Sequence, residues 1–253
     1  MLDRAFFMHF LKPHVMSHAV FPDPAVWQIL FNRQVENLKT KACPEFFAGL
    51  ERLGFAAGEV PVLDHLSQRL YQLNGWQIQR VPGIVDAGDF LALLADRIFP
   101  STYFLRSMAQ LDYLEEPDMF HDLFGHLPLL ADPAISEFYQ KLGALGVAVH
   151  GDTEALERIE RFYWYTVEFG LVEAPAGGVQ IYGSGLLSSF GESRQIYGGA
   201  VEIRPFDLVE ILELPFDKSQ MQPVYYVVPD FEFLFGQLEK LASAGLALRP
   251  VLS

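Results

Sequence analysis

Two histidines and one glutamate stand out in this sequence because the residues around them are apolar and aromatic. His121 and His126 lie in the segment EPDMFHDLFGHLPLL (116–130), and Glu168 lies in FYWYTVEFGL (162–171). Imidazole and carboxylate groups are costly in such surroundings unless a partner compensates for the lost water. Two histidines and one carboxylate can occupy one face of an octahedral iron(II) ion and leave positions for oxygen and a substrate, as in non-haem iron oxygenases. The pattern therefore indicates a metal site with oxygenase chemistry.

The spacing of the two histidines sets a geometric condition on such a site. His121 and His126 are five residues apart, which corresponds to about 140° of rotation on an ideal α-helix. Both rings could not face one metal from a regular helix. Gly125 before the second histidine and Pro128 after it indicate that the helix is distorted or ends there. Glu168 must arrive from a different helix, one that we expect to end at Gly170.

A zinc-type hydrolase on the same three ligands is an alternative. The His-Glu-x-x-His motif of zinc proteases has a spacing of four and places the general base directly after the first histidine. Here the spacing is five and the following residue is Asp122, which disfavours that class. A hydrolase would need a base near the open metal position, for which Asp122 or Glu192 could be considered. A protein that binds an amino acid without converting it is a third class.

The composition narrows the function further. The chain has 253 residues with 18 basic and 32 acidic side chains, and no basic cluster occurs in it. Its net charge of −14 would repel nucleic acid and anionic membrane surfaces, so both classes of partner are excluded. The single cysteine, Cys43, cannot form an internal disulfide and is expected to be a buried or half-buried filler rather than a nucleophile. The apolar run in residues 1–15 is too short and interrupted for a signal peptide or membrane span, so we expect a cytoplasmic protein.

The elements that must position the site are mostly helices. Apolar residues recur at helical spacing behind a capping residue or a proline, which predicts helices over 23–38, 46–53, 61–73, 89–99, 133–145, 152–169 and 231–241. Short strands are predicted over 77–79, 179–182 and 224–228, with a loop over 81–85 and an extended segment over 101–106. The fold class is therefore mainly α with a few short β-strands. We expect one domain over 23–253 and an amino-terminal extension of unknown role over 1–22.

Three long motifs carry a resemblance to a known family. The two segments given above, followed by IYGSGLLSSFGE (181–192), closely resemble the aromatic amino acid hydroxylases, and within them the bacterial phenylalanine 4-hydroxylase branch. The similarity covers roughly residues 23–240. The resemblance implies that family's catalytic-domain fold and a tetrahydropterin-dependent, non-haem iron(II) monooxygenase that converts L-phenylalanine to L-tyrosine with O₂. Tryptophan as substrate, or another ring position of phenylalanine, stays open.

The resemblance also implies roles for individual residues. His121, His126 and Glu168 match the iron ligands, and Arg106 matches the arginine that grips the substrate carboxylate, a role that suits a planar guanidinium. Asp118 is expected to help orient a histidine. The rest of the amino-acid site is implied to be Trp164, Phe169, Gly185 and Ser188, with Ser188 near the first iron histidine. The pterin site is implied to be Val81, Gly83, Val85, Phe90 and Tyr163, with Phe90 stacked on the pterin ring.

Three positions depart from the family pattern. Leu114 replaces a threonine near the substrate, Ala87 replaces a serine in the pterin loop, and Pro100 replaces a histidine near the pterin. These departures bear on pterin affinity and substrate preference. Neither an amino-terminal regulatory domain nor a long carboxy-terminal tetramerisation helix is visible in the sequence, so a monomer is expected.

Overall fold

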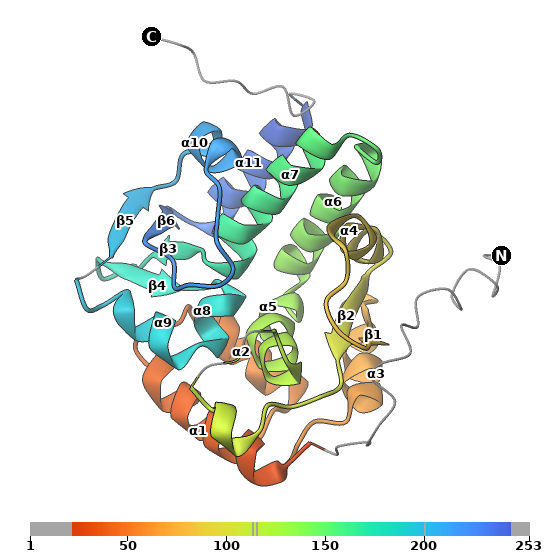
Figure 1. Ribbon diagram of the computed structural model, residues 1–253, viewed down its shortest axis with the longest axis vertical. Helices are drawn as coiled ribbons and strands as arrows, with labels where there is room; N and C mark the ends of the chain where they lie inside the picture. Colours follow the sequence, from red (N-terminus) through yellow and green to blue (C-terminus); the bar gives the residue numbers. More distant parts are fainter. Residues whose placement is uncertain (1–21, 113, 115, 200, 244–253) are drawn as a thin grey trace, which may run out of the picture.

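The computed structural model describes residues 22–112, 114, 116–199 and 201–243 (Figure 1). Its α-helices are α1 (Pro24–Leu38), α2 (Pro44–Leu53), α3 (Leu63–Asn74), α4 (Ala87–Ala95), α5 (Leu127–Leu130), α6 (Pro133–Ala148), α7 (Thr153–Tyr163), α8 (Ser184–Ser188), α9 (Phe190–Gln195), α10 (Leu208–Glu213) and α11 (Phe231–Ser243). A 3₁₀ turn, η2 (Met108–Gln110), and two π-helical segments, η3 (His121–His126) and η4 (Trp164–Glu168), complete the helical part. The predicted mainly helical fold is confirmed.

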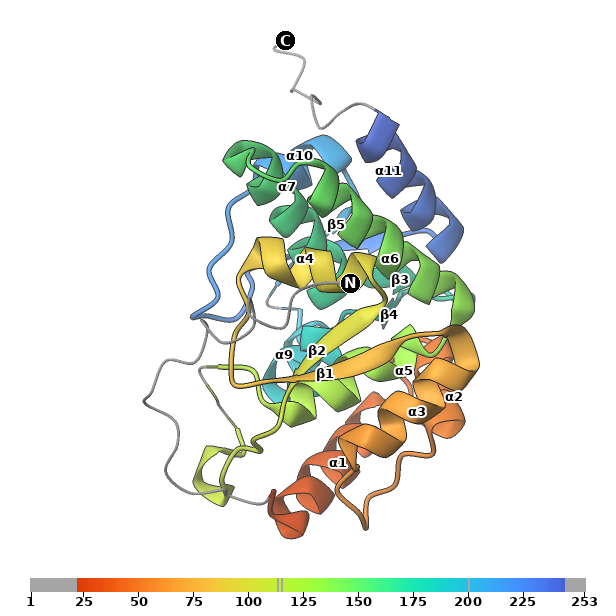
Figure 2. The ribbon, with the colours of Figure 1, turned by 90° about the vertical axis from the view of Figure 1, so that its right-hand side faces the viewer.

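The strands form two small sheets on opposite sides of the central helices (Figure 1). One sheet pairs β1 (Gln77–Val81) with β2 (Ile98–Thr102) in parallel, and Figure 2 shows it between α3 and α4. The other has the order β4-β3-β6-β5, built from β3 (Leu171–Glu173), β4 (Val179–Ile181), β5 (Glu202–Pro205) and β6 (Val224–Val228). In it β3 and β5 both run parallel to β6, and β4 runs antiparallel to β3.

The helix ends follow local capping chemistry. The Asp23 carboxylate accepts the Ala25 N–H at 2.9 Å, and Asp132 caps α6 in the same way, which satisfies backbone donors that a helix start leaves open. At the other end, α2 and α3 stop at Gly54 and Gly75, whose φ angles are +68° and +80°. Glycine adopts this left-handed conformation without strain. α2 ends at the predicted residue 53, and α3 ends one residue after the predicted residue 73.

The predicted helix over 89–99 is wrong at its carboxyl end. α4 stops at Ala95, and Arg97 takes a left-handed φ of +59° that turns the chain into β2. Pro100 therefore lies inside a strand, where its missing N–H would break the ladder of a central strand. β2 tolerates it because β1 is its single partner in a two-stranded sheet.

An aromatic core lies behind the two histidines. The Phe120 ring stacks on Phe124 with 4.7 Å between centroids, and Trp27 meets Phe120 edge-on at 5.4 Å. Phe120, Phe124 and Trp27 are each at most 1% exposed. These contacts fix η3 from its buried side, since paired rings gain packing energy beyond simple burial. Cys43 is buried in the same core, as predicted.

Two further predictions bear on the outer parts of the chain. The extension predicted over 1–22 lies outside the described residues except for Pro22. Among the helices that the structure describes, none combines the length and apolar character needed to span a membrane.

Candidate metal centre and its cavity

A π-helical turn solves the spacing problem of the two histidines. Because η3 is a π-helical segment, in which hydrogen bonds join residues five positions apart, rather than an α-helix, His121 and His126 fall on the same side of it. Their Nε2 atoms lie 3.1 Å apart. The predicted distortion of this helix is therefore confirmed, and it is a change of winding rather than a break.

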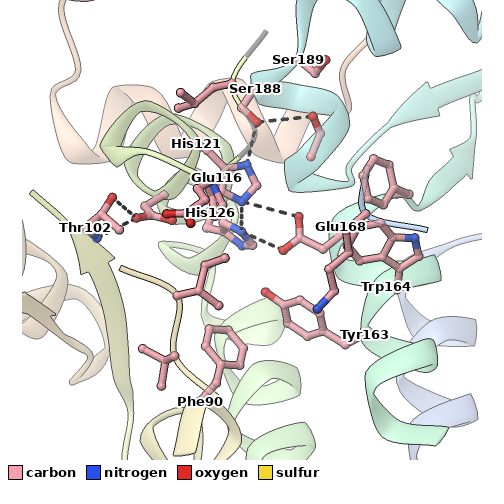
Figure 3. Close-up of a pocket in the computed structure, with 18 of the residues that line it drawn as sticks. Phe90, Thr102, Glu116, His121, His126, Tyr163, Trp164, Glu168, Ser188 and Ser189 are labelled. Carbon is pink, nitrogen blue, oxygen red and sulfur yellow. Dashed lines mark hydrogen bonds and ion pairs between the residues drawn. The ribbon is translucent and has the colours of Figure 1, made fainter. Parts of the chain in front are cut away.

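Glu168 reaches the same point from a second π-helical segment. η4 continues α7 and ends just before Phe169. The carboxylate places Oε1 at 3.1 Å from His126 Nε2 and Oε2 at 3.7 Å from His121 Nε2 (Figure 3). One ligand atom from each of the three residues lies within 4.8 Å of the others. The structure thus brings together the three residues that the sequence singled out.

Ser188 fixes the tautomer of the His121 ring, that is, which ring nitrogen carries the hydrogen. Its Oγ lies 2.9 Å from His121 Nδ1 (Figure 3), and it lies 2.8 Å from the Ser184 carbonyl oxygen. Since the hydroxyl hydrogen is donated to that carbonyl, Oγ accepts a hydrogen from Nδ1. This assignment leaves the Nε2 lone pair directed at Glu168 and His126, as a metal-binding imidazole requires.

The pKa shifts of His121 and Glu168 also favour the protonation states that bind a metal ion. Burial, helped by the neighbouring His126, lowers the pKa of His121 to about 4, so this imidazole is neutral at pH 7. Burial alone would raise the pKa of Glu168, but His126, His121 and a hydrogen bond from Tyr163 outweigh it and lower that pKa to about 2. A neutral imidazole and an ionised carboxylate are the forms that bind a metal ion.

Arg106 and Asp118 form a buried bidentate ion pair beside the cluster. Asp118 is fully buried and accepts from Arg106 Nε and Nη2 at 2.9 Å each, and from the Arg106 backbone N–H. It also accepts the His121 backbone N–H at 3.2 Å. Burial would raise the pKa of Asp118, but the Arg106 guanidinium outweighs it and lowers that pKa. Asp118 therefore contacts His121 through the backbone of that residue and not through its ring.

One cavity of about 590 Å³ is lined by every residue that the resemblance assigned to the iron ligands, the pterin site or the amino-acid site. Two edge-on or tilted ring pairs shape it: Phe90 with Tyr163 at 5.3 Å and Trp164 with Phe169 at 4.6 Å. A Cβ added at Gly185 would lie 2.9 Å from the Phe169 ring, so glycine is needed for this packing. The full predicted set in the lining is Val81, Gly83, Val85, Phe90, Arg106, His121, His126, Tyr163, Trp164, Glu168, Phe169, Gly185 and Ser188, and the departures Ala87, Pro100 and Leu114 line it too.

Asp122 lines the cavity, but its carboxyl group is held by hydrogen bonds. Asp122, considered above as a hydrolase base, instead accepts from the Thr102 N–H and hydroxyl at 2.7 and 2.8 Å. Burial raises the pKa of Asp122 to about 7, although those hydrogen bonds act to lower it.

Sequence reasoning missed the segment 214–223. This segment adds Phe216, Lys218, Ser219, Gln220 and Met221 to the cavity wall. It carries no periodicity or motif that could have indicated this, because tertiary contacts bring it to the site.

Comparison with known proteins gives consistent matches over nearly the whole chain. The family model described as biopterin-dependent aromatic amino acid hydroxylase matches residues 19–248. Phenylalanine-4-hydroxylase of Chromobacterium violaceum is 43% identical over 227 residues, which cover 89% of this chain and 76% of that protein. A structure of the C. violaceum enzyme with bound oxidised Fe(III) matches with a TM-score of 0.80 at 40% identity, covering 90% of this chain and 87% of that one. The cold-active phenylalanine hydroxylase of Colwellia psychrerythraea 34H matches with a TM-score of 0.82 at 34% identity, covering 94% and 93%.

Proposed function

The chain belongs to the biopterin-dependent aromatic amino acid hydroxylases, and on that basis we propose that it hydroxylates L-phenylalanine to L-tyrosine with O₂, iron(II) and a tetrahydropterin. The observation that carries the proposal is the convergence of His121, His126 and Glu168 inside a cavity lined by aromatic rings. The similarity to bacterial phenylalanine-4-hydroxylases supports the choice of substrate. The zinc-type hydrolase is not favoured, since the family match and the hydrogen-bonded state of Asp122 both count against it.

The donor set fits iron(II). His121 and His126 offer imidazole nitrogens, and Glu168 offers a carboxylate oxygen, which together form a facial set of two histidines and one carboxylate. Ser188 would hold the His121 ring in its ligand tautomer through the 2.9 Å contact to Nδ1. When bound, the iron and the pterin together supply activation of oxygen for attack on the aromatic ring.

Arg106 would receive the carboxylate of the amino acid. Among the described residues, the side-chain hydrogen bonds of its guanidinium go to Asp118 alone, through Nε and Nη2. The planar fork carries five N–H donors, so donors remain for a second carboxylate in the cavity. The pair with Asp118 holds the fork in place before the ligand arrives, which reduces the entropy lost on binding.

The aromatic ring of the substrate would lie against Trp164 and Phe169. Both rings line the cavity, and Trp164 lies beside Glu168 (Figure 3). Burying a benzyl group between aromatic walls gains both area and ring contacts. The walls also exclude water from the space between the substrate ring and the three metal-binding groups. Selectivity among aromatic amino acids would follow from the shape of this wall, where a change of one methylene is worth about 1–3 kcal/mol.

The pterin would bind where the end of β1, the 82–86 loop and α4 meet. Val81, Gly83, Val85 and Phe90 line this part of the cavity, and the Tyr163 ring packs edge-on against Phe90. Phe90 is only partly buried, so its ring is presented to a stacked heterocycle. Ala87 and Pro100 line the same region without a side-chain hydrogen-bond donor, so these two positions would donate no side-chain hydrogen bond to the pterin.

The experiment that tests the proposal identifies the product. The protein is supplied with iron(II), a tetrahydropterin and O₂, and each aromatic amino acid is offered separately. Tyrosine from phenylalanine, with equimolar pterin oxidation, is the expected result. A different ring position, a clear preference for tryptophan, or pterin-independent hydrolysis of another substrate would overturn it.

A further inference from the structure

The segment 214–223, between α10 and β6, covers the amino-acid end of the cavity. Phe216 and Met221 line the cavity from this segment, and the Phe216 ring stacks on Trp164 with 4.3 Å between centroids and 13° between planes. Most of its residues are exposed. What holds such a segment against the cavity therefore decides how well the aromatic wall is formed.

Gln222 is the buried anchor of this segment. It is 3% exposed, and its side-chain Oε1 accepts the indole N–H of Trp164 at 3.1 Å. Its Nε2 donates to the carbonyl oxygens of Asp217 and Gln220 at 3.0 and 2.9 Å. One amide group thus joins the aromatic wall to the middle of the covering segment.

The backbone of Gln222 is fixed as firmly as its side chain. Its N–H donates to Glu192 Oε1 at 2.9 Å, and its carbonyl oxygen accepts from Gln195 Nε2 at 3.0 Å. Glu192 and Gln195 both belong to α9, and both also contact the Tyr225 hydroxyl. All four polar atoms of Gln222 are therefore used, and together they connect the segment 214–223, Trp164 and α9.

Other hydrogen bonds of the segment do not replace this anchor. Within the described residues, Tyr165 holds its beginning by donating to the Pro215 carbonyl at 3.0 Å. The side-chain bonds of Ser219 and Gln220 both go to Asp217, inside the segment itself. Without the Gln222 amide, residues 216–221 would keep the Phe216–Trp164 stack but lose their hydrogen bonds to the anchored end.

We propose that Gln222 is a positioning residue that clamps the segment 214–223 over the amino-acid end of the cavity and holds the Trp164 indole in its wall orientation. The inference rests on the proposed function for the identity of the ligand. It assigns Gln222 an effect on capture of the aromatic amino acid and none on pterin binding or on the metal-binding groups.

Two variants separate the role of the Gln222 side-chain oxygen, the acceptor, from that of its nitrogen, the donor. Gln222→Leu removes both the acceptor for Trp164 and the donors to the segment. Gln222→Glu keeps the acceptor, loses both donors, and serves if the leucine variant does not fold. The matched control is Gln140→Leu, because Gln140 likewise accepts from a side chain, Arg97 Nε at 2.9 Å, and donates to a backbone carbonyl, that of Ala95, away from the cavity.

The first readout needs no turnover. The chain has three tryptophans, and Trp27 and Trp76 are 0% exposed, so acrylamide quenching of the full chain reports Trp164. Quenching should rise in Gln222→Leu, rise less in Gln222→Glu, and stay at the wild-type level in Gln140→Leu. Unchanged quenching in both Gln222 variants would overturn the clamp.

The second readout is the split between kinetic constants. Since several buried hydrogen bonds are lost, the KM for phenylalanine should rise about tenfold or more in Gln222→Leu, with the KM for the tetrahydropterin unchanged. A fall in kcat at unchanged KM for phenylalanine, or an equal rise in both KM values, would overturn the proposal. If the wild type hydroxylates no aromatic amino acid, the proposed function fails while the quenching result still decides the clamp.

Discussion

Removing the Ser188 hydroxyl should weaken iron(II) binding although it removes no ligand. Ser188 Oγ is the hydrogen-bond partner of His121 Nδ1 at 2.9 Å, and the Ser184 carbonyl, 2.8 Å away, orients that hydroxyl. In Ser188→Ala the imidazole N–H would face a methyl group inside the protein, and the ring would lose its fixed tautomer. Loss of such an outer contact to a ligand histidine typically lowers metal affinity about 10–100-fold, which is about 1.4–2.8 kcal/mol.

An anaerobic competition titration of iron(II) against a chromophoric chelator measures this effect. The control is Ser136→Ala, which deletes another buried hydroxyl that donates to a backbone carbonyl, that of Pro133 at 2.9 Å in α6. The control should bind iron(II) like the wild type, and both variants should show cooperative thermal unfolding. An unchanged iron(II) affinity in folded Ser188→Ala would refute the idea that Ser188 orients His121 for the metal.

Three further predictions concern the support of the site. Gly125→Ala places a Cβ 2.7 Å from the Ser184 carbonyl oxygen, so overpacking should lower the free energy of unfolding by about 1–3 kcal/mol; an unchanged urea midpoint would argue against tight packing of η3 on α8. Asp118→Ala leaves the Arg106 guanidinium without its buried partner and should lower the free energy of unfolding by about 3–5 kcal/mol, measured again by urea titration. A decrease of about 1 kcal/mol or less, which is typical of a surface ion pair, would contradict the burial of this pair. Burial raises the pKa of the Cys43 thiol well above its usual range, so it stays protonated at pH 8 and should react with a thiol reagent only after unfolding; rapid labelling of the native chain would contradict this.

The sequence was most informative where structure depends on neighbouring residues alone. The Asp23-Pro24 pair sets the start of α1, and Gly54 and Gly75 set the ends of α2 and α3, because caps and left-handed glycines act within one turn. β2 could not be predicted, since Pro100 reads locally as a helix stop and its place in a strand depends on pairing with β1. The three-residue strand β3 is likewise defined by its partners β4 and β6.

The site shows the same division. The ligand-type residues could be selected because His121, His126 and Glu168 are isolated polar groups in apolar sequence, and the structure brings them together. Their roles, together with the expected monomer and cytoplasmic location, stay predictions. The π-helical winding of η3 was expected only as a distortion. The anchoring of the segment 214–223 by Gln222 depends on contacts to residues some thirty to sixty positions away in the chain, which no local pattern encodes.

The most direct test of the metal centre is the amount of iron(II) bound per chain in the wild type and in Glu168→Ala. Both proteins are loaded anaerobically, dialysed and analysed for metal, with circular dichroism to show that each is folded. Convergence of the three side chains predicts one tightly held ion in the wild type and loss of most of it in the variant. A folded Glu168→Ala protein that keeps one ion with wild-type affinity, or a wild type that retains none, would contradict the assignment.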